Sequence, residues 1–129
     1  MKVGALVTID ETKVLVVEDD LLIRMATVIS LEDAGFAVFE AANFNEAMAL
    51  LKSKPLIQAI FTDIDMLPGL NGLELAMAVR RRWPAIKIMI TSGHRHIQNE
   101  DLPVIGRFFR KPYDPKLVAN ALREMTSAA

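Results

Sequence analysis

The chain has 129 residues, of which 52% are hydrophobic and 24% are charged, and these values fit one globular domain with its own core. Fifteen basic and sixteen acidic residues leave a formal net charge of −1, which gives no electrostatic basis for binding nucleic acid or an anionic membrane. The absence of cysteine excludes disulfides and thiolate metal sites. Because no uncharged run approaches the roughly 20 apolar residues that span a bilayer, and the N-terminus lacks a signal-like pattern, we expect a cytoplasmic protein.

The first half of the chain alternates strand-like and helix-like patterns. Residues 14–17 are an uninterrupted aliphatic run, which predicts a strand that is covered on both faces. Apolar residues at helical spacing predict a helix over residues 21–34, and Gly35 would end it. A second strand is expected over residues 36–41, and Asn43 is placed to cap the helix that follows.

The same alternation continues through the second half. Residues 57–62 predict a third strand, residues 72–82 a helix, and residues 86–91 a fourth strand. After an irregular polar stretch, residues 107–110 are typical of a short fifth strand. Asp114 is then placed to cap a last helix.

Alternating strands and helices predict an α/β fold, a doubly wound parallel sheet of five strands with helices on both faces. In such sheets, ligands bind beyond the carboxyl ends of the strands. Polar side chains follow four of these predicted ends, with carboxylates after the first and third, hydroxyls after the fourth and an ammonium after the fifth. They are Glu18, Asp19, Asp20, Asp63, Asp65, Thr91, Ser92 and Lys111.

This set of side chains favours a divalent cation and a phosphoryl group. Converging carboxylates repel one another unless a cation neutralises them, and oxygen ligands favour Mg²⁺, with Mn²⁺ as a substitute. A lysine ammonium and a threonine hydroxyl can bind phosphoryl oxygens that the metal also contacts. Asp20 is set apart because it directly precedes a helix and is expected to cap it.

Four segments, in this order, resemble the motifs of response-regulator receiver domains, the phosphoaccepting domains of two-component signalling. They are VLVVEDD (14–20), FTDIDM with PGLNG (61–72), IMITSG (88–93) and FFRKPY (108–113). The resemblance implies a receiver domain over residues 13–129, preceded by an N-terminal extension of residues 1–12. It also implies the flavodoxin-like strand order 2-1-3-4-5.

The resemblance assigns a role to each matching side chain. Asp63 would be the phosphoacceptor, and Lys111 and Thr91 would bind phosphoryl oxygens. The implied metal ligands are Asp19, Glu18 through water, Asp63, and the main-chain carbonyl of Asp65. The side chain of Asp65 would point toward the rim of the site.

The resemblance also implies a switch and a special peptide bond. Thr91 and Phe108 would move together on phosphorylation, and the peptide between Lys111 and Pro112 would be cis. Leu67 has no counterpart in the family pattern. The segment between Thr91 and Lys111 is shorter than usual, so a standard fourth-helix output surface is not expected.

The helix predicted over residues 21–34 is apolar on more than one side, so it cannot bury every face against one sheet. We expect an exposed partner surface on it, formed by Leu22, Met25, Val28 and Ile29. In the family this helix commonly meets a histidine kinase or a histidine phosphotransfer protein. Ordinary packing and formation of a homodimer are the alternatives.

The function predicted from this resemblance is that of a stand-alone receiver rather than an enzyme, with self-phosphorylation from small donors and self-dephosphorylation as its chemistry. The signal would leave by contact with a downstream protein or by onward phosphoryl transfer. One alternative is a small haloacid-dehalogenase-like phosphatase, because Asp63-Ile64-Asp65 mimics its DxD motif. Another is a degenerate receiver that binds partners without phosphorylation.

Overall fold

The computed structural model describes residues 11–54, 56–65, 72–93 and 107–127. Its elements follow in the predicted order, as β1 (Lys13–Val17), α2 (Leu21–Asp33), β2 (Ala37–Ala41), α3 (Phe44–Ser53), β3 (Ala59–Asp63), α4 (Gly72–Arg82), β4 (Lys87–Ser92), β5 (Arg107–Arg110) and α5 (Pro115–Ser127). The bounds of α4 and β5 are those predicted, whereas β3 includes Asp63, which was expected just after it. Residues 1–10 of the predicted extension, Leu67, and residues 94–106 lie outside the described residues.

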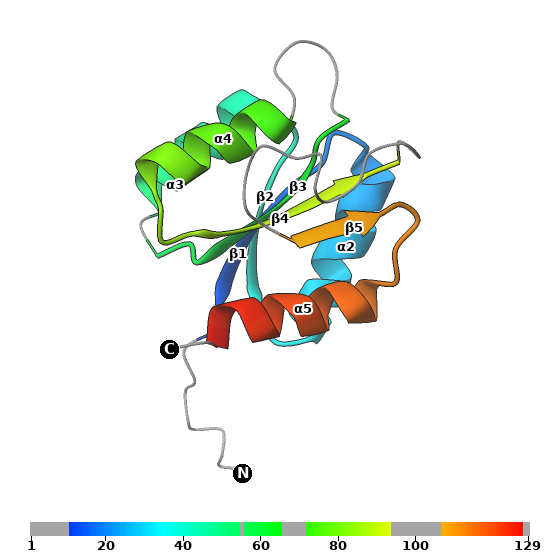
Figure 1. Cartoon of the computed structure of the whole chain (residues 1–129). Helices are drawn as coiled ribbons and strands as arrows, with labels where there is room; N and C mark the ends of the chain where they lie inside the picture. The colour runs from blue at the N-terminus through cyan, green and yellow to red at the C-terminus, as the bar shows by residue number, and fades with distance from the viewer. Residues whose placement is uncertain (1–10, 55, 66–71, 94–106, 128–129) are drawn as a thin grey trace.

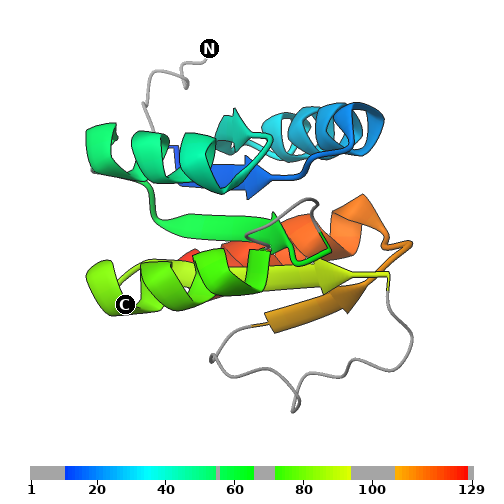
Figure 2. The same ribbon diagram turned by 90° about the horizontal axis from the view of Figure 1, so that it is seen from above.

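All four strand pairs are parallel, and the strand order is β2-β1-β3-β4-β5. Figure 2 shows β1, β3, β4 and β5 side by side with their arrows running the same way. Asp63 at the end of β3 pairs in register with Thr91 of β4, and Ser92 pairs with Arg110 of β5. The doubly wound fold is therefore confirmed, and the carboxyl ends of its strands form one edge.

Local sequence signals account for the ends of the helices. The Asp20 carboxylate accepts a hydrogen bond from the Ile23 N–H (3.0 Å), and the Asn43 side chain accepts one from the Glu46 N–H (2.8 Å), so both residues act as N-caps. Gly35 follows α2 with φ of +99°, a left-handed conformation that glycine adopts without the penalty of a Cβ atom.

The sheet has a hydrophobic layer on each face, with α3 and α4 over one face and α2 and α5 over the other (Figure 1). Leu15, Ile60 and Ile88 point to the α3–α4 side, and their chain neighbours Val16, Phe61 and Met89 point to the α2–α5 side. Because both faces are buried, the strands are continuous apolar runs. None of the described helices combines the length and the apolar character that crossing a membrane would require.

Candidate functional site

Three predicted side chains meet at the carboxyl edge of the sheet. The Lys111 ammonium lies 2.8 Å from Asp63 Oδ2 and 3.0 Å from Glu18 Oε1. These residues follow or end β5, β3 and β1, so the parallel sheet brings together positions that are far apart in the chain. The peptide bond between Lys111 and Pro112 is cis, as the resemblance implied.

The Asp63 carboxylate is buried and held at both oxygens. Its exposed fraction is 3%; Oδ1 accepts a hydrogen bond from the Asp65 N–H (2.8 Å), and Oδ2 accepts one from Lys111. On the main-chain side, Gly72 at the start of α4 lies so close to Asp63 that a Cβ atom would be 1.9 Å from the Asp63 carbonyl oxygen. Asp63 is thus held by contacts from α4 and from Lys111 after β5.

Burial and charge set the protonation of this cluster. Burial raises the pKa of Glu18 from 4.5 to about 7, and the negative charge of Asp63 adds to the increase, while bonds from Lys111 and Asp20 oppose it. Burial alone would lower the pKa of Lys111, but its hydrogen bonds to Asp63 and Glu18 outweigh burial and raise it. Lys111 therefore stays charged and partly neutralises the carboxylates.

The carboxylates of Glu18, Asp19 and Asp63 form a group that fits a divalent cation. One oxygen of each lies within 4.8 Å of one oxygen of each of the others, close enough for a single ion to contact all three. Glu18 and Asp63 are buried and Asp19 is exposed. Carboxylate oxygens with one open side are the donors that Mg²⁺ uses when it keeps several waters, so this donor set fits the predicted metal.

Thr91 and Phe108 lie on neighbouring strands, and Phe108 pairs with Ile90, the residue before Thr91. Thr91 is buried, and its hydroxyl has no hydrogen-bond partner among the residues that the structure describes. A buried hydroxyl without a partner is uncommon, and a phosphoryl oxygen on Asp63 would be a suitable one, because the two residues pair in register. Phe108 is half-buried and packs against the α3–α4 core.

The Asp65 side chain has partners that the sequence did not predict. Its carboxylate accepts hydrogen bonds from Ser92 Oγ (3.0 and 3.1 Å) and from the Gly93 N–H (2.7 Å) at the end of β4. The side chain is thus fastened to the neighbouring strand end, whereas we expected it to point toward the rim. The signal in the sequence is weak, since Ser92 only follows Thr91 at a predicted strand end.

Arg24 also contacts this site, and the sequence analysis did not predict it. Its guanidinium donates to the main-chain carbonyl of Glu18 (2.8 Å) and pairs with Glu40 (3.0 Å). It therefore anchors the segment that carries Glu18 and Asp19. A usable signal existed, because Arg24 is the one charged residue in the otherwise uncharged sequence from residue 21 to residue 31.

Comparison with known proteins decides the family. The model of the response regulator receiver domain matches residues 14–123. The chain belongs to this family. Its fold and its site residues at the strand ends agree with a receiver, and neither the phosphatase nor the degenerate receiver is favoured.

Individual relatives show how far the likeness extends. An NtrX-like response regulator of Rickettsia felis is 36% identical over 87 residues, which are 66% of this chain and 18% of the relative. The receiver protein CpdR of Brucella abortus is 31% identical over 120 residues, which are 91% of this chain and 98% of CpdR. A receiver from Sinorhizobium medicae has a TM-score of 0.84 at 24% identity, covering 94% of this chain and 98% of that one, and so shows the fold alone.

The first receiver helix, α2, carries the expected apolar surface, with one correction. Leu22, Met25 and Ile29 are exposed by 76%, 47% and 55%. The prediction was wrong for Val28, which is 8% exposed and packs in the α2–α5 core. Helical spacing placed Val28 on one stripe with Met25 and Ile29, but the sheet covers the side to which Val28 turns.

Beside this surface is a hollow of about 550 Å³ between α2 and the connection from β5 to α5. Leu22, Ala26, Pro112 and Tyr113 line it together with Lys111, so the hollow reaches the edge of the receiver site. The Tyr113 hydroxyl lies 2.7 Å from Thr27 Oγ1, and its ring packs edge-on against Phe61. These contacts hold the Tyr113 side chain, which lines the hollow.

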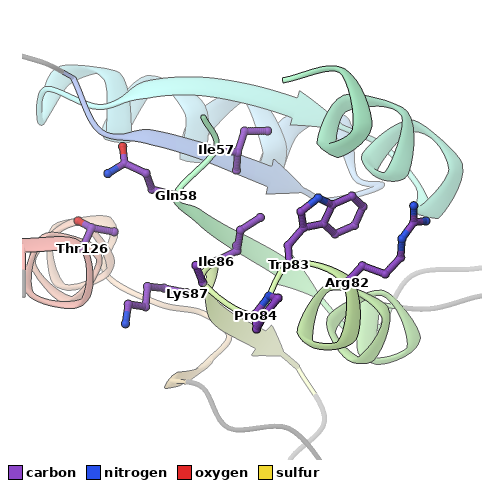
Figure 3. Close-up of a pocket in the computed structure, with 9 residues that line it drawn as sticks. Ile57, Gln58, Arg82, Trp83, Pro84, Ile86, Lys87 and Thr126 are labelled. Atoms are coloured by element: carbon purple, nitrogen blue, oxygen red, sulfur yellow. The ribbon is translucent and has the colours of Figure 1, made fainter. Parts of the chain in front are cut away.

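A different hollow, of about 440 Å³, lies at the opposite, amino-terminal edge of the sheet. Figure 3 shows Trp83, Ile57 and Ile86 around it, with Arg82 and Lys87 alongside. It contains none of the predicted site residues. The acidic cluster at the carboxyl edge is therefore the candidate for phosphoryl chemistry.

Proposed function

We propose that Asp63 accepts a phosphoryl group from a histidine kinase or a histidine phosphotransfer protein. The observation that carries this proposal is the buried Asp63 carboxylate, 2.8 Å from the Lys111 ammonium and within the same acidic group as Glu18 and Asp19. Phosphoryl transfer needs in-line positioning and charge neutralisation more than covalent chemistry from the protein. Lys111 would supply charge neutralisation, and the hydrogen bonds to both Asp63 oxygens would hold the carboxylate for in-line attack.

In the proposed step, one carboxylate oxygen of Asp63 attacks the phosphorus of a phosphohistidine. A phosphorus–oxygen bond forms, the phosphorus–nitrogen bond breaks, and the imidazole nitrogen keeps the electron pair and takes up a proton. Lys111 would offset charge on the phosphoryl oxygens. Glu18, Asp19, Asp63 and the Asp65 carbonyl would hold Mg²⁺, or Mn²⁺ in its place, which would supply further positive charge there.

Thr91 and Phe108 would transmit the effect of phosphorylation from Asp63 to the rest of the domain. The buried Thr91 hydroxyl would bind a phosphoryl oxygen, and Phe108 would turn inward as Thr91 moves. The chain matches CpdR over nearly the full length of that receiver, and we propose that it acts as a receiver in the cytoplasm. Its signal would then leave through a downstream protein or by onward phosphoryl transfer.

Phosphorylation of Asp63 is tested by incubating the protein with Mg²⁺ and acetyl phosphate and then measuring its intact mass. We expect one phosphoryl adduct in the wild type and none in Asp63→Asn. The Asp20→Asn variant is the matched control, because asparagine keeps the helix cap and lies outside the acidic group. Absence of an adduct in the wild type, or an adduct that persists in Asp63→Asn, would contradict the proposal.

The partner surface on α2 is proposed to receive the helical bundle of the phosphodonor. Leu22, Met25 and Ile29 are exposed, and the adjoining hollow includes Lys111, so a helix seated there would lie next to the acceptor. Met25→Glu should slow transfer from a cognate kinase at least tenfold and leave labelling by acetyl phosphate unchanged. Leu56→Glu, at another exposed leucine, should change neither rate.

Two results would argue against this surface. Equal kinase transfer to Met25→Glu and wild type would exclude α2 as the donor contact. A change from dimer to monomer in Met25→Glu, without a loss of kinase transfer, would instead assign the surface to a homodimer. Sedimentation of both proteins distinguishes these outcomes.

A further inference from the structure

Four hydrogen bonds form a closed ring around the Asp63 carboxylate. The Asp65 N–H donates to Asp63 Oδ1 (2.8 Å), and the Asp65 carboxylate accepts from Ser92 Oγ (3.0 Å). The Ser92 carbonyl accepts from the Lys111 N–H (2.9 Å), and Lys111 Nζ donates to Asp63 Oδ2 (2.8 Å). The ring therefore passes through the ends of β3, β4 and β5.

The hydrogen bond from Ser92 to the Asp65 carboxylate holds the chain just beyond the end of β3. The Ile64 N–H still donates to the Thr91 carbonyl (3.0 Å), so the sheet holds the chain as far as Ile64. Asp65 is the next residue, and its own carboxylate joins it to Ser92 and Gly93. Ser92 is fully buried, so its hydroxyl is held in place to make this bond.

We propose that Ser92 is a positioning residue for phosphoryl acceptance. By holding the Asp65 carboxylate at the end of β4, it keeps the Asp65 N–H on Asp63 Oδ1 and so fixes the plane of the acceptor carboxylate. In-line attack depends on that orientation. The inference rests on the proposed role of Asp63 and adds Ser92, which lies outside the acidic group, as a residue that sets the rate.

The test is a double-mutant cycle of Ser92→Ala and Asp65→Ala, with the rate of adduct formation from acetyl phosphate and Mg²⁺ as the readout. Ser92→Ala should slow the reaction about tenfold, the scale set by losing one hydrogen bond to a charged group. The double variant should react no more slowly than Asp65→Ala alone, because both changes break the same contact. Ser53→Ala, an exposed serine on α3, should react at the wild-type rate.

Amide hydrogen exchange supplies a readout that does not depend on phosphorylation. In Ser92→Ala, the Asp65 amide should exchange at least tenfold faster while the Ile90 amide in β4 keeps its protection. A wild-type reaction rate in Ser92→Ala, rate losses that multiply in the double variant, or an unchanged Asp65 amide would each overturn the inference. If the wild type forms no adduct, the proposed function fails, and the exchange result alone decides whether Ser92 holds Asp65.

Discussion

A Cβ atom at Gly72 would lie 1.9 Å from the main-chain carbonyl oxygen of Asp63 and 2.7 Å from Thr62 Oγ1. The first residue of α4 can therefore pack against Asp63 only as glycine. Gly72→Ala should lower the free energy of unfolding by about 2 kcal/mol, the scale of overpacking in a core, and slow labelling of Asp63. Chemical denaturation and acetyl phosphate labelling measure the two effects.

Gly93→Ala is the control for this substitution. A Cβ atom at Gly93 would meet the Asp65 carboxylate at 3.9 Å, an ordinary contact, so its stability should stay within about 0.5 kcal/mol of the wild type. Equal stability of Gly72→Ala and Gly93→Ala would show that α4 shifts away from β3 without cost.

Thr91→Val should stabilise the unphosphorylated protein by about 1 kcal/mol, because it replaces a buried hydroxyl that lacks a partner with a methyl group of the same shape. Thr62→Val is the matched comparison on β3. The Thr62 hydroxyl donates to the Asp63 carbonyl (3.2 Å), so its loss should destabilise by a similar amount. Urea denaturation of both variants gives the result, and a destabilised Thr91→Val would contradict the assignment.

Lys111→Met should destabilise the metal-free protein by about 3 kcal/mol, because it leaves the buried Glu18 and Asp63 carboxylates without their cation. Mg²⁺ should then raise the melting temperature of the variant more than that of the wild type. Lys87→Met, which removes an exposed lysine at the start of β4, controls for net charge. A smaller Mg²⁺ effect in Lys111→Met would argue against a metal beside Lys111.

Glu18→Gln tests the raised pKa of Glu18. Between its ordinary pKa of 4.5 and its folded value of about 7, the folded protein binds more protons at this carboxyl than the unfolded chain, so stability falls as pH rises through this window. Glutamine does not titrate. In EDTA, the variant should therefore gain about 2–3 kcal/mol on the wild type from pH 5 to pH 8.

Urea denaturation at several pH values measures this difference. Glu124→Gln, at an exposed glutamate that pairs with Arg107 (3.5 Å), should show no comparable gain. If Glu18→Gln and wild type keep a constant difference across this range, the folded pKa of Glu18 is not raised.

The sequence predicted the elements and the main cluster because both depend on local signals. Aliphatic runs marked the strands, and Asp20, Asn43 and Gly35 marked helix ends, each through a contact within a few residues. The position of Asp63 and Lys111 at strand ends then followed from the rule that parallel strands share a carboxyl edge.

The features that the sequence did not predict depend on the register between strands and on which face of a helix packs against the sheet. The bond between Asp65 and Ser92 requires the pairing of Asp63 with Thr91, which periodicity does not specify. Val28 lies within a helical stripe that has exposed neighbours on both sides, so spacing alone could not separate it from Met25 and Ile29. Arg24 reaches the Glu18 carbonyl across a turn; its isolated charge in the sequence marks the residue but does not specify this acceptor.

The hydroxyl of Thr91 would have a hydrogen-bond partner in the phosphorylated receiver, but it has none among the described residues of the unphosphorylated one. Without a phosphoryl group, the molecule has a buried donor that no described residue satisfies, a deficiency of about 1–3 kcal/mol. If Asp63 accepts a phosphoryl group as proposed, a phosphoryl oxygen would satisfy this hydroxyl and remove that cost. The switch would then be favoured because it removes a cost that the unphosphorylated protein already has.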